Sequence, residues 1–386
     1  MSRDLIFVAL SLLTWGFGES AFIAFQPLYL QNLGAEPVQI GLIYGAYGFA
    51  ASLIHIPAGY LADRIGRRPL MWAAWIIGVG AAGMMALATS LAWFVAGMLL
   101  YGSTMFVVSP MNSYVTAARG RFSVGRALTL VSATYSIGVV LGPLFGGLVG
   151  ERFGIRSIFA IAALIFVLST ILILFIKPQP LDHASHAETD NNLFSNPRYL
   201  AFLPVFFLFM FSTYLPQPLS PNFLQNYGGL SLTDIGQLYS VNGLGVIVLN
   251  LTLGQLDARL GFLLGQVFVG AFAVLLWQGS SSLAYFLGYF FLGGFRTTRL
   301  LGLAQIRPHI RNADMGLAYG LIETSGAIAM LLAAPLAGYL FERNPVSVYF
   351  VSIVLIGFSI IISLLFAYKP RSHQIEMVRN LEESQP

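Results

Sequence analysis

The sequence predicts an all-α integral membrane protein whose twelve transmembrane helices form two pseudo-symmetric six-helix bundles. Three observations support this fold class. Only 9% of the 386 residues are charged and 57% are hydrophobic, whereas a soluble globular domain has about 25% charged residues. The apolar residues form long continuous runs, which favour helices over the short alternating segments of a membrane barrel. The two halves of the chain also share an ordered series of sequence matches.

Apolar runs of membrane-crossing length define the predicted spans. A hydrocarbon core about 30 Å thick needs about 20 helical residues. Cutting the chain at charged and turn-rich points gives six spans in the first half, residues 5–32, 38–63, 69–89, 91–117, 125–150 and 155–177. Six more follow in the second half, residues 198–226, 232–257, 261–280, 282–308, 314–342 and 345–369. The first span is too long for the apolar core of a signal peptide.

A polar linker divides the two halves. Residues 178–197, PQPLDHASHAETDNNLFSNP, form the only long polar stretch inside the sequence. We therefore predict a first six-helix bundle in residues 1–177 and a second bundle, ending in a short polar tail, in residues 198–386. The linker between them is predicted to be cytoplasmic, for the reason given next.

The distribution of lysine and arginine predicts the orientation. With both termini inside, fifteen of the twenty basic residues fall on that side, and only Arg152, Arg156 and Arg343 fall outside. Arg296 and Arg299 lie within a span. This excess is the positive-inside pattern. We expect a multi-pass protein of a plasma membrane, such as the prokaryotic inner membrane, with both termini cytoplasmic.

An internal repeat relates the two halves. PLYLQNLG, at residues 27–34, returns as PNFLQNYG at residues 221–228. IGLIYGAYG, at residues 40–48, returns as IGQLYSVNG at residues 235–243, and further matches follow in the same order. Because each half has six spans, both copies begin on the same side of the membrane. The sequence thus predicts a parallel repeat about an axis along the membrane normal, as in transporters whose halves rock.

The loop between the second and third spans carries a specific motif, GYLADRIGRRP. Its glycines permit a tight turn and close helix approach, and its acid and arginines can bind helix ends and each other. The motif resembles the G-x-L-a-D-r-x-G-r-[RK] signature of the major facilitator superfamily, and the resemblance covers essentially the whole chain. It implies that the loop latches the two halves on the cytoplasmic side through the gating residues Gly59, Asp63, Arg64, Gly66, Arg67 and Arg68. The alternative is a basic loop that only sets orientation.

The second half has a degenerate copy of this loop, GQLDARLG, with its acid one place early at Asp257. The fifth span contains SIGVVLGPLFGG, in which Gly142 and Pro143 belong to a G-x-x-x-G-P-x-x-G-G pattern. This pattern resembles that of the proton-coupled drug exporters of the superfamily and implies a gating role, although ordinary tight helix packing is the alternative. Those exporters usually carry an arginine in the fourth span, where Leu99 stands here. That departure weakens the case for their usual drug–proton exchange.

Five charged or histidine residues lie away from the ends of the predicted spans, namely Glu19, His55, Arg296, Arg299 and Glu323. A charge at mid-bilayer costs at least about 2.5–3.5 kcal/mol, so such residues face protein or a watery cavity. At a rise of about 1.5 Å per residue, Arg299 and Glu323 each lie about 13 Å from the cytoplasmic surface on adjacent antiparallel helices, where they can pair. Arg296 lies one turn deeper on the same face, near the midplane, and Glu19 reaches a similar depth.

These positions predict separate roles. We expect Arg299, held by Glu323, to serve structure or gating. The resemblance implies that the first, fourth, seventh and tenth spans line a central cavity, so we expect Arg296 to bind an anionic substrate group, or Glu19 when the site is empty. Glu19 is predicted to contact substrate and to carry the coupling proton, with Glu323 and His55 as further proton-coupling candidates. The alternative is that the four charges are structural ion pairs and His55 is a packing residue.

Other polar and aromatic residues on the cavity-lining spans are candidates for substrate contact. They are Tyr29 on the first span, Asn112 on the fourth, and Tyr214 and Gln217 on the seventh. The seventh span also contains LPQPLSPN, whose prolines break the helical hydrogen-bond ladder and predict a kinked or unwound segment. Broken helices in transporters often mark the binding site or a gate. The alternative is a bend without ligand contact.

The sequence as a whole favours a secondary active transporter that moves a small organic solute, anionic or amphipathic, by alternating access. Proton coupling is expected, and export is slightly favoured over uptake. The sequence has no Walker A motif to bind ATP and no metal or nucleophile motif of an enzyme. The alternatives are a lipid or sugar carrier of the same fold and, from another class, a non-transporting membrane receptor.

Few partners are expected beside the substrate, the lipid bilayer and the proton. The chain has no cysteine, which excludes disulfides and thiolate metal sites. No cofactor and no metal are expected. The basic residues fall in short loops where they set orientation, so nucleic acid is not an expected partner. We expect a monomer.

Overall fold

The computed structural model describes residues 2–53, 65–179, 193–310 and 315–368, and all of its regular elements within these ranges are helices. The first half contains α1 (Arg3–Ile23), α2 (Gln26–Asn32), α3 (Pro37–Leu53), α5 (Arg67–Leu87), α6 (Leu91–Ser103), α7 (Val108–Ala118), α8 (Val124–Phe153) and α9 (Ile155–Leu174). The second half contains α10 (Pro197–Tyr214), α11 (Ser220–Asn226), α12 (Leu232–Leu253), α13 (Ala258–Gln278), α14 (Ser282–Leu292), α15 (Gly294–Ile306), α16 (Met315–Arg343) and α17 (Ser347–Tyr368). The predicted all-α fold is confirmed.

Local sequence sets many helix ends. The hydroxyl oxygen of Ser123 accepts a hydrogen bond from the Arg126 N–H at the start of α8. Ser231 and Asp234 form a reciprocal capping box at the start of α12. Gly154, with φ of +85°, separates α8 from α9 in a backbone conformation that favours glycine. These polar and glycine positions fall at the edges of the apolar runs, which explains why the predicted span boundaries lie close to the observed ones.

Several predicted spans consist of two helices. Span 198–226 is interrupted between Tyr214 and Ser220, where the predicted proline-rich break lies. Span 5–32 breaks between α1 and α2, just before Pro27, which occupies the first turn of α2 and cannot donate to the preceding turn. Span 282–308 breaks at Gly293, between α14 and α15. The break in span 198–226 was predicted; the other two were not.

Within the described residues, nine helical segments are long and apolar enough to cross a membrane. The predicted spans not among them are 38–63, whose second part lies outside the described residues, and the interrupted spans 198–226 and 282–308. The count of twelve therefore stays a prediction.

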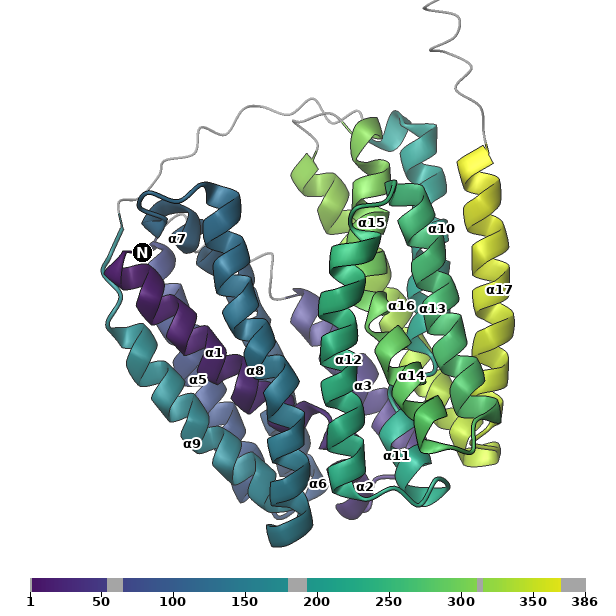
Figure 1. Ribbon diagram of the computed structural model, residues 1–386, viewed down its shortest axis with the longest axis horizontal. Helices are drawn as coiled ribbons and strands as arrows, with labels where there is room; N and C mark the ends of the chain where they lie inside the picture. Colours follow the sequence, from purple (N-terminus) through teal and green to yellow (C-terminus); the bar gives the residue numbers. More distant parts are fainter. Residues whose placement is uncertain (1, 54–64, 180–192, 311–314, 369–386) are drawn as a thin grey trace, which may run out of the picture.

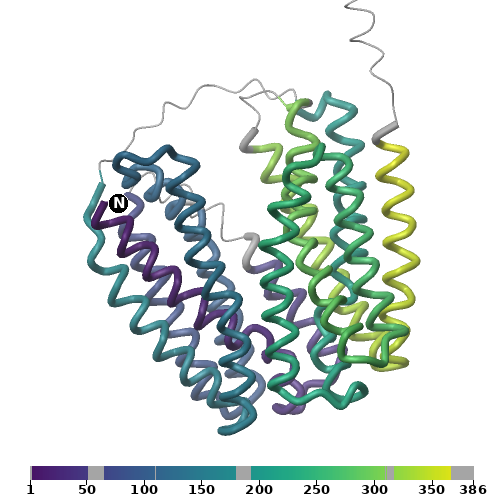
Figure 2. Tube along the Cα trace, viewed as in Figure 1, coloured from purple at the N-terminus to yellow at the C-terminus, as the bar shows by residue number. Residues whose placement is uncertain are grey.

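Most helices of each half gather into a separate group, whereas α2 and α3 of the first half lie beside the second group (Figures 1 and 2). In the first group α1 packs against α8 and α9, and α5 packs against α6 and α9. In the second group α13 packs against α14, α15 and α17, while α10 packs against α16. The start of α1, the end of α9, the start of α10 and the end of α17 all lie at one end of the molecule (Figure 1), here named the linker end. The opposite end, which carries α2 and α11, is named the far end.

The two groups touch through two helix crossings and diverge toward the linker end (Figure 1). One crossing joins α3 to α16 and the other joins α8 to α12. Glycines lie at both contacts. A Cβ atom at Gly41 of α3 would overlap the carbonyl oxygen of Ala334, and one at Gly45 would lie 2.8 Å from the carbonyl oxygen of Leu331. In the other crossing a Cβ at Gly236 of α12 would overlap the carbonyl oxygen of Pro143. The halves thus meet backbone to backbone, as small residues permit in membrane helices.

Side-chain amides also connect the two halves at the far end, between α2 and α11. The Asn222 Nδ2 atom of α11 donates to the Gln31 Oε1 atom of α2 at 2.6 Å and to the Pro27 carbonyl at 3.1 Å. Asn226 donates to the same Gln31 oxygen at 3.2 Å. Asn222 is 1% exposed and its bond to the Pro27 carbonyl is buried, whereas the Asn226–Gln31 bond is exposed. The repeated segments PLYLQNLG and PNFLQNYG therefore meet each other at the far end.

We predict that Gly41→Leu shifts the molecule away from this far-end-closed arrangement. The added side chain overlaps the α16 backbone, and overpacking of this kind costs about 1–3 kcal/mol. The chain has no native cysteine, so spin labels on cysteines introduced at Val124 and Leu251 report directly on the separation of α8 and α12 at the linker end. The variant should populate a shorter label distance.

The matched control is Gly83→Leu in α5, where an added Cβ would meet no atom within 4 Å. The control should leave the distance distribution as in the wild-type protein. An unchanged distribution in Gly41→Leu would contradict the assigned role of the glycine crossing.

Candidate functional site

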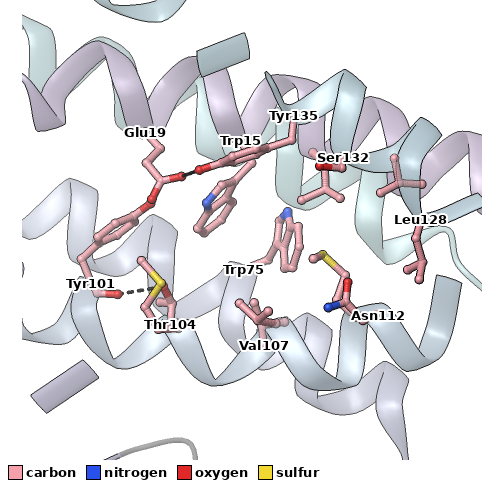
Figure 3. A pocket seen from close by; sticks show the side chains of 15 residues that line it. Trp15, Glu19, Trp75, Tyr101, Thr104, Val107, Asn112, Leu128, Ser132 and Tyr135 are labelled. Atoms are coloured by element: carbon pink, nitrogen blue, oxygen red, sulfur yellow. Dashed lines mark hydrogen bonds between the residues drawn. The ribbon is translucent and has the colours of Figure 1, made fainter. Parts of the chain in front are cut away.

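A pocket of about 260 Å³ lies within the first half (Figure 3). Its walls come from α1, α5, α6, α7, α8 and the short segment that joins α6 to α7. The lining residues are mainly aromatic and aliphatic: Leu12, Trp15, Glu19, Trp75, Tyr101, Thr104, Met105, Val107, Val108, Met111, Asn112, Leu128, Val131, Ser132 and Tyr135. Ligand pockets commonly combine such an apolar lining with a few placed polar groups.

Glu19 supplies the ionisable group of this lining. Its side chain lies at one end of the pocket with Tyr101 and Tyr135, and Asn112 and Leu128 lie toward the opposite end (Figure 3). The Tyr135 hydroxyl donates to the Glu19 Oε2 atom at 2.7 Å. The Tyr101 hydroxyl is buried beside the same carboxyl group. Since Glu19 is only 6% exposed, its charge depends on these neighbours rather than on water.

Arg296 brings the second half to this site. It lies on α15 and interacts both with the Tyr135 hydroxyl and, electrostatically, with the Glu19 carboxyl group. Tyr135 of α8 thus interacts with both groups, and the pairing of Arg296 with Glu19 stays a prediction. Arg296 is exposed, whereas Glu19 is buried. The guanidinium group thus has donors left for a further acceptor.

Two tryptophans form a wall of the pocket. The ring of Trp15 on α1 stacks on Phe166 of α9 with centroids 4.2 Å apart, and it lies 4.9 Å from the ring of Trp75 on α5. Gly78 makes room for this arrangement, because a Cβ there would overlap the Trp15 ring. Both indoles are nearly buried and face the pocket (Figure 3).

The predicted ion pair between Arg299 and Glu323 is confirmed. A guanidinium nitrogen of Arg299 on α15 contacts the Glu323 carboxylate on α16. The two side chains are 40% and 37% exposed, so the pair lies on a partly open face of the second half. It joins α15 to α16 by side chains.

The other predicted contact residues are divided between the pocket and the core. Asn112 lines the pocket. Tyr29 does not: it is 6% exposed and packs against Phe94 and Phe159 at centroid distances of 4.9 and 5.1 Å. In this arrangement Tyr29 fills an aromatic core rather than facing the pocket, because the break before α2 turns this segment into the helix group.

Tyr214 and Gln217 lie at the break between α10 and α11. The Tyr214 ring lies 6.4 Å from the ring of Phe295, the residue before Arg296. Gln217 donates its amide to the Thr213 carbonyl at 2.7 Å, so it satisfies backbone at the break. Neither residue is among those that line the pocket of the first half, all of which lie in the described part of the chain.

The loop between the second and third predicted spans is only partly described. Its residues Gly59, Asp63 and Arg64, and His55 of the second span, lie outside the described residues. Gly66 has φ of +87°, which favours glycine at this turn. Arg67 donates to Gln179 at 3.3 Å, and the Arg68 guanidinium lies 3.9 Å from the centroid of the Trp72 ring.

Asp257 accepts a hydrogen bond from the Arg259 N–H at 3.0 Å and thereby caps α13. On α8, Gly142 and Pro143 face different neighbours. A Cβ at Gly142 would overlap the Phe17 carbonyl of α1, and the Pro143 carbonyl contacts α12 at Gly236. This segment therefore belongs to a packed helix contact and, at the same time, to the crossing between the halves.

The sequence interpretation missed Tyr135 and Trp75 as site residues. One signal for Tyr135 was available: Leu128, Val131, Ser132 and Tyr135 recur at three- and four-residue spacing, which places them on one helix face. No comparable signal singles out Trp75, because aromatic residues make up 14% of the chain.

Known proteins resemble the chain over most of its length. The family model described as Major Facilitator Superfamily matches residues 8–295 and 203–383. The multi-drug resistance efflux pump PmrA of Streptococcus pneumoniae is 27% identical over 306 residues, covering 74% of this chain and 75% of PmrA. The multidrug resistance protein MdtG of Escherichia fergusonii is 28% identical over 278 residues, covering 67% of each chain.

Solved structures show the same fold. A variant of the nucleoside transporter NupG superposes with a TM-score of 0.81 at 16% sequence identity, covering 94% of this chain and 98% of that one. A variant of the peptide transporter POT superposes with a TM-score of 0.78 at 16% identity, covering 95% of this chain and 94% of that one.

We predict that Arg299 and Glu323 are energetically coupled. Arg299→Gln or Glu323→Gln leaves one unpaired charge and should lower the free energy of unfolding by about 1–3 kcal/mol, between the values for exposed and buried pairs. The double variant should lose less than the sum of the two single losses. Thermal unfolding of the purified variants measures this coupling, with Arg126→Gln at the exposed start of α8 as the control. Strictly additive losses would show that the contact contributes nothing.

Proposed function

The chain belongs to the major facilitator superfamily, and on that premise we propose that it is a secondary active transporter that moves a small amphipathic organic solute by alternating access in exchange for protons. It is a multi-pass membrane protein of a transporter family rather than an enzyme. We further propose the predicted topology of twelve spans in two bundles, residues 1–177 and 198–386, and a monomeric state.

One observation carries the proposal: a carboxyl group, a phenol and a guanidinium group meet where the two halves approach each other at the pocket. Glu19 and Tyr135 belong to the first half, and Arg296 belongs to the second. A solute with an anionic group engages the Arg296 donors, which draws the second half toward the pocket. Protonation of Glu19 removes the charge that holds Arg296 and frees it for substrate. Binding of solute, proton state and relative position of the halves are thereby linked through the same three groups.

The orientation follows from the basic residues. We propose that the linker end faces the cytoplasm, because Arg67, Arg119, Arg126 and Arg259 lie at helix ends on that side, whereas Arg152, Arg156 and Arg343 lie at far-end positions. The far end, closed by glycine crossings and by the amides of Gln31 and Asn222, then faces outward. In this assignment the described arrangement opens to the cytoplasm.

The proposed direction is export. PmrA and MdtG are named as multidrug efflux proteins, and the glycine pattern around Gly142 and Pro143 resembles that of exporters. The aromatic and aliphatic lining of the pocket suits an amphipathic solute. Leu99, in place of the usual exporter arginine, separates this chain from their usual proton path. We therefore assign the coupling proton to Glu19, with Glu323 and His55 as further candidates.

Gating residues are proposed at both ends. The Arg299–Glu323 pair joins α15 to α16 in the second half. Gly142 and Pro143 form part of the closure at the far end. The loop residues Gly59, Asp63, Arg64, Gly66, Arg67 and Arg68 are proposed, together with Asp257, to latch the cytoplasmic side when it closes.

We predict that Arg296→Ala abolishes stabilisation by anionic solutes. A thermal-shift screen of the purified protein with organic anions, cations, sugars and lipids identifies the ligand class, since a ligand at 100 times its Kd adds about 2.7 kcal/mol. Arg299→Ala, one turn away on the same helix, is the matched control and should keep the ligand response. Stabilisation by cations or neutral solutes that persists in Arg296→Ala would remove Arg296 from the substrate site.

We predict that Glu19→Gln uncouples transport from the proton gradient. The amide preserves the side-chain shape and can still accept a hydrogen bond from Tyr135, but it cannot release a proton. Transport of the identified solute into proteoliposomes, measured with and without an imposed pH gradient, should respond to the gradient in the wild-type protein and in the control Glu36→Gln. A Glu19→Gln protein that still responds would exclude Glu19 as the proton carrier, and the same assay on Glu323→Gln would test the next candidate.

A further inference from the structure

We propose that Ser169 of α9 is a positioning residue that fixes the Trp75 indole in the pocket wall and so sets the preference of the pocket for flat ring systems. The inference rests on the proposed function, because it takes the pocket as the place where the transported solute binds. Among the described residues, α9 contributes none to the pocket lining. Ser169 therefore acts on the site only through another residue.

The Ser169 hydroxyl both accepts and donates a hydrogen bond. The Trp75 Nε1–H donates to the Ser169 Oγ atom at 2.9 Å. The same hydroxyl donates to the Ser11 carbonyl of α1 at 2.7 Å. Ser11 in turn donates to the Ser169 carbonyl at 2.9 Å. Ser169 and Ser11 are both fully buried, so no water competes for these bonds.

This bond decides how the Trp75 ring lies. The N–H group is the only hydrogen-bond donor of an indole, and a buried indole finds a partner for it. With that group held by α9, one edge of the ring is tied to the outer helix and the rest faces the pocket (Figure 3). The neighbouring Trp15 is held independently by its stack on Phe166 and by the space above Gly78. The two indoles thus present a wall of fixed shape.

A wall of fixed aromatic rings discriminates between ligand shapes. A flat ring system gains from stacking only if the ring it contacts holds a fixed orientation. A flexible alkyl chain adapts to either orientation of the wall and gains mainly from buried area. In Ser169→Ala the Trp75 N–H loses its hydrogen-bond acceptor, and the indole is no longer held in one orientation. The change should therefore weaken binding of flat rings more than binding of alkyl chains.

The test measures affinity by titration calorimetry with four probes. Two carry a flat naphthyl group, naphthoate and naphthylmethylamine, and two carry a flexible decyl group, decanoate and decylamine. Using both charge signs makes the test independent of whether the site prefers anions or cations. Ser169→Ala should weaken the better naphthyl probe about three- to tenfold, the range expected for one net hydrogen bond, and the decyl probe of the same charge less than twofold.

Two further variants separate positioning from general damage. Ser11→Ala removes the other hydroxyl of the serine pair and leaves the Trp75 bond, so it should keep the wild-type ratio of naphthyl to decyl affinity. In a Trp75→Phe background, which has no N–H to position, Ser169→Ala should change neither affinity further. Equal weakening of both probe shapes, or an effect of Ser169→Ala that persists in Trp75→Phe, would overturn the inference.

A measurement without ligand tests the positioning role of Ser169 independently of the proposed function. Nitrogen-labelled tryptophan gives one indole N–H signal for each of the five tryptophans, and Trp75→Phe assigns the signal of Trp75. Hydrogen exchange at Trp75 should be slow in the wild-type protein and in Ser11→Ala, and at least tenfold faster in Ser169→Ala. Unchanged exchange in Ser169→Ala would overturn the positioning role whether or not a probe binds. Absence of binding by all four probes to the wild-type protein would instead count against the pocket as the transport site.

Discussion

The two halves of this protein meet backbone to backbone where glycines remove side chains from the contact, and the rest of the arrangement depends on these crossings. At Gly41 and Gly236 the backbone of one half lies directly against the backbone of the other. Glycine crossings bring α3 to α16 and α8 to α12 at the far end. Toward the linker end the helix groups diverge (Figure 1).

The crossing and the site are parts of the same helix. Along α8, Tyr135 reaches Glu19, Gly142 packs on α1 one residue from Glu19, and Pro143 meets α12. Tyr135 and Pro143 are eight residues apart, about 12 Å along the helix. A shift of α12 against Pro143 therefore acts on a rigid helix that also orients Tyr135. An unpaired charge is costly in a membrane. Such a shift therefore changes the free energy of the charged Glu19 and Arg296 side chains. This is a physical reason for the gate and the charge-bearing site to move together.

The sequence predicted much of the fold and part of the site. Hydrophobic run length predicted the helices, and the prolines around Gln217 predicted the break in span 198–226. Depth counting placed Arg299 beside Glu323, because a helix has a fixed rise per residue. Rotation about the helix axis is not fixed by depth, and this is why Tyr29, expected at the cavity, packs in an aromatic core here, while Tyr135 was missed. Rotation depends on packing partners that lie far away in the sequence, such as Phe94 and Phe159 for Tyr29.

A comparison of the two halves shows why Ser169 carried no signal in the sequence. In the second half Gln266 of α13 is fully buried and is bonded by Ser359 and Ser363 of α17. In the first half Trp75 of α5 is bonded by Ser169 of α9. Both halves thus satisfy one polar side chain of their third predicted span with serine hydroxyls of their sixth. In the first half that side chain also forms part of the wall of the pocket described above. The repeat therefore accounts for the serines as packing polar groups, and their functional meaning depends on which side chain they hold.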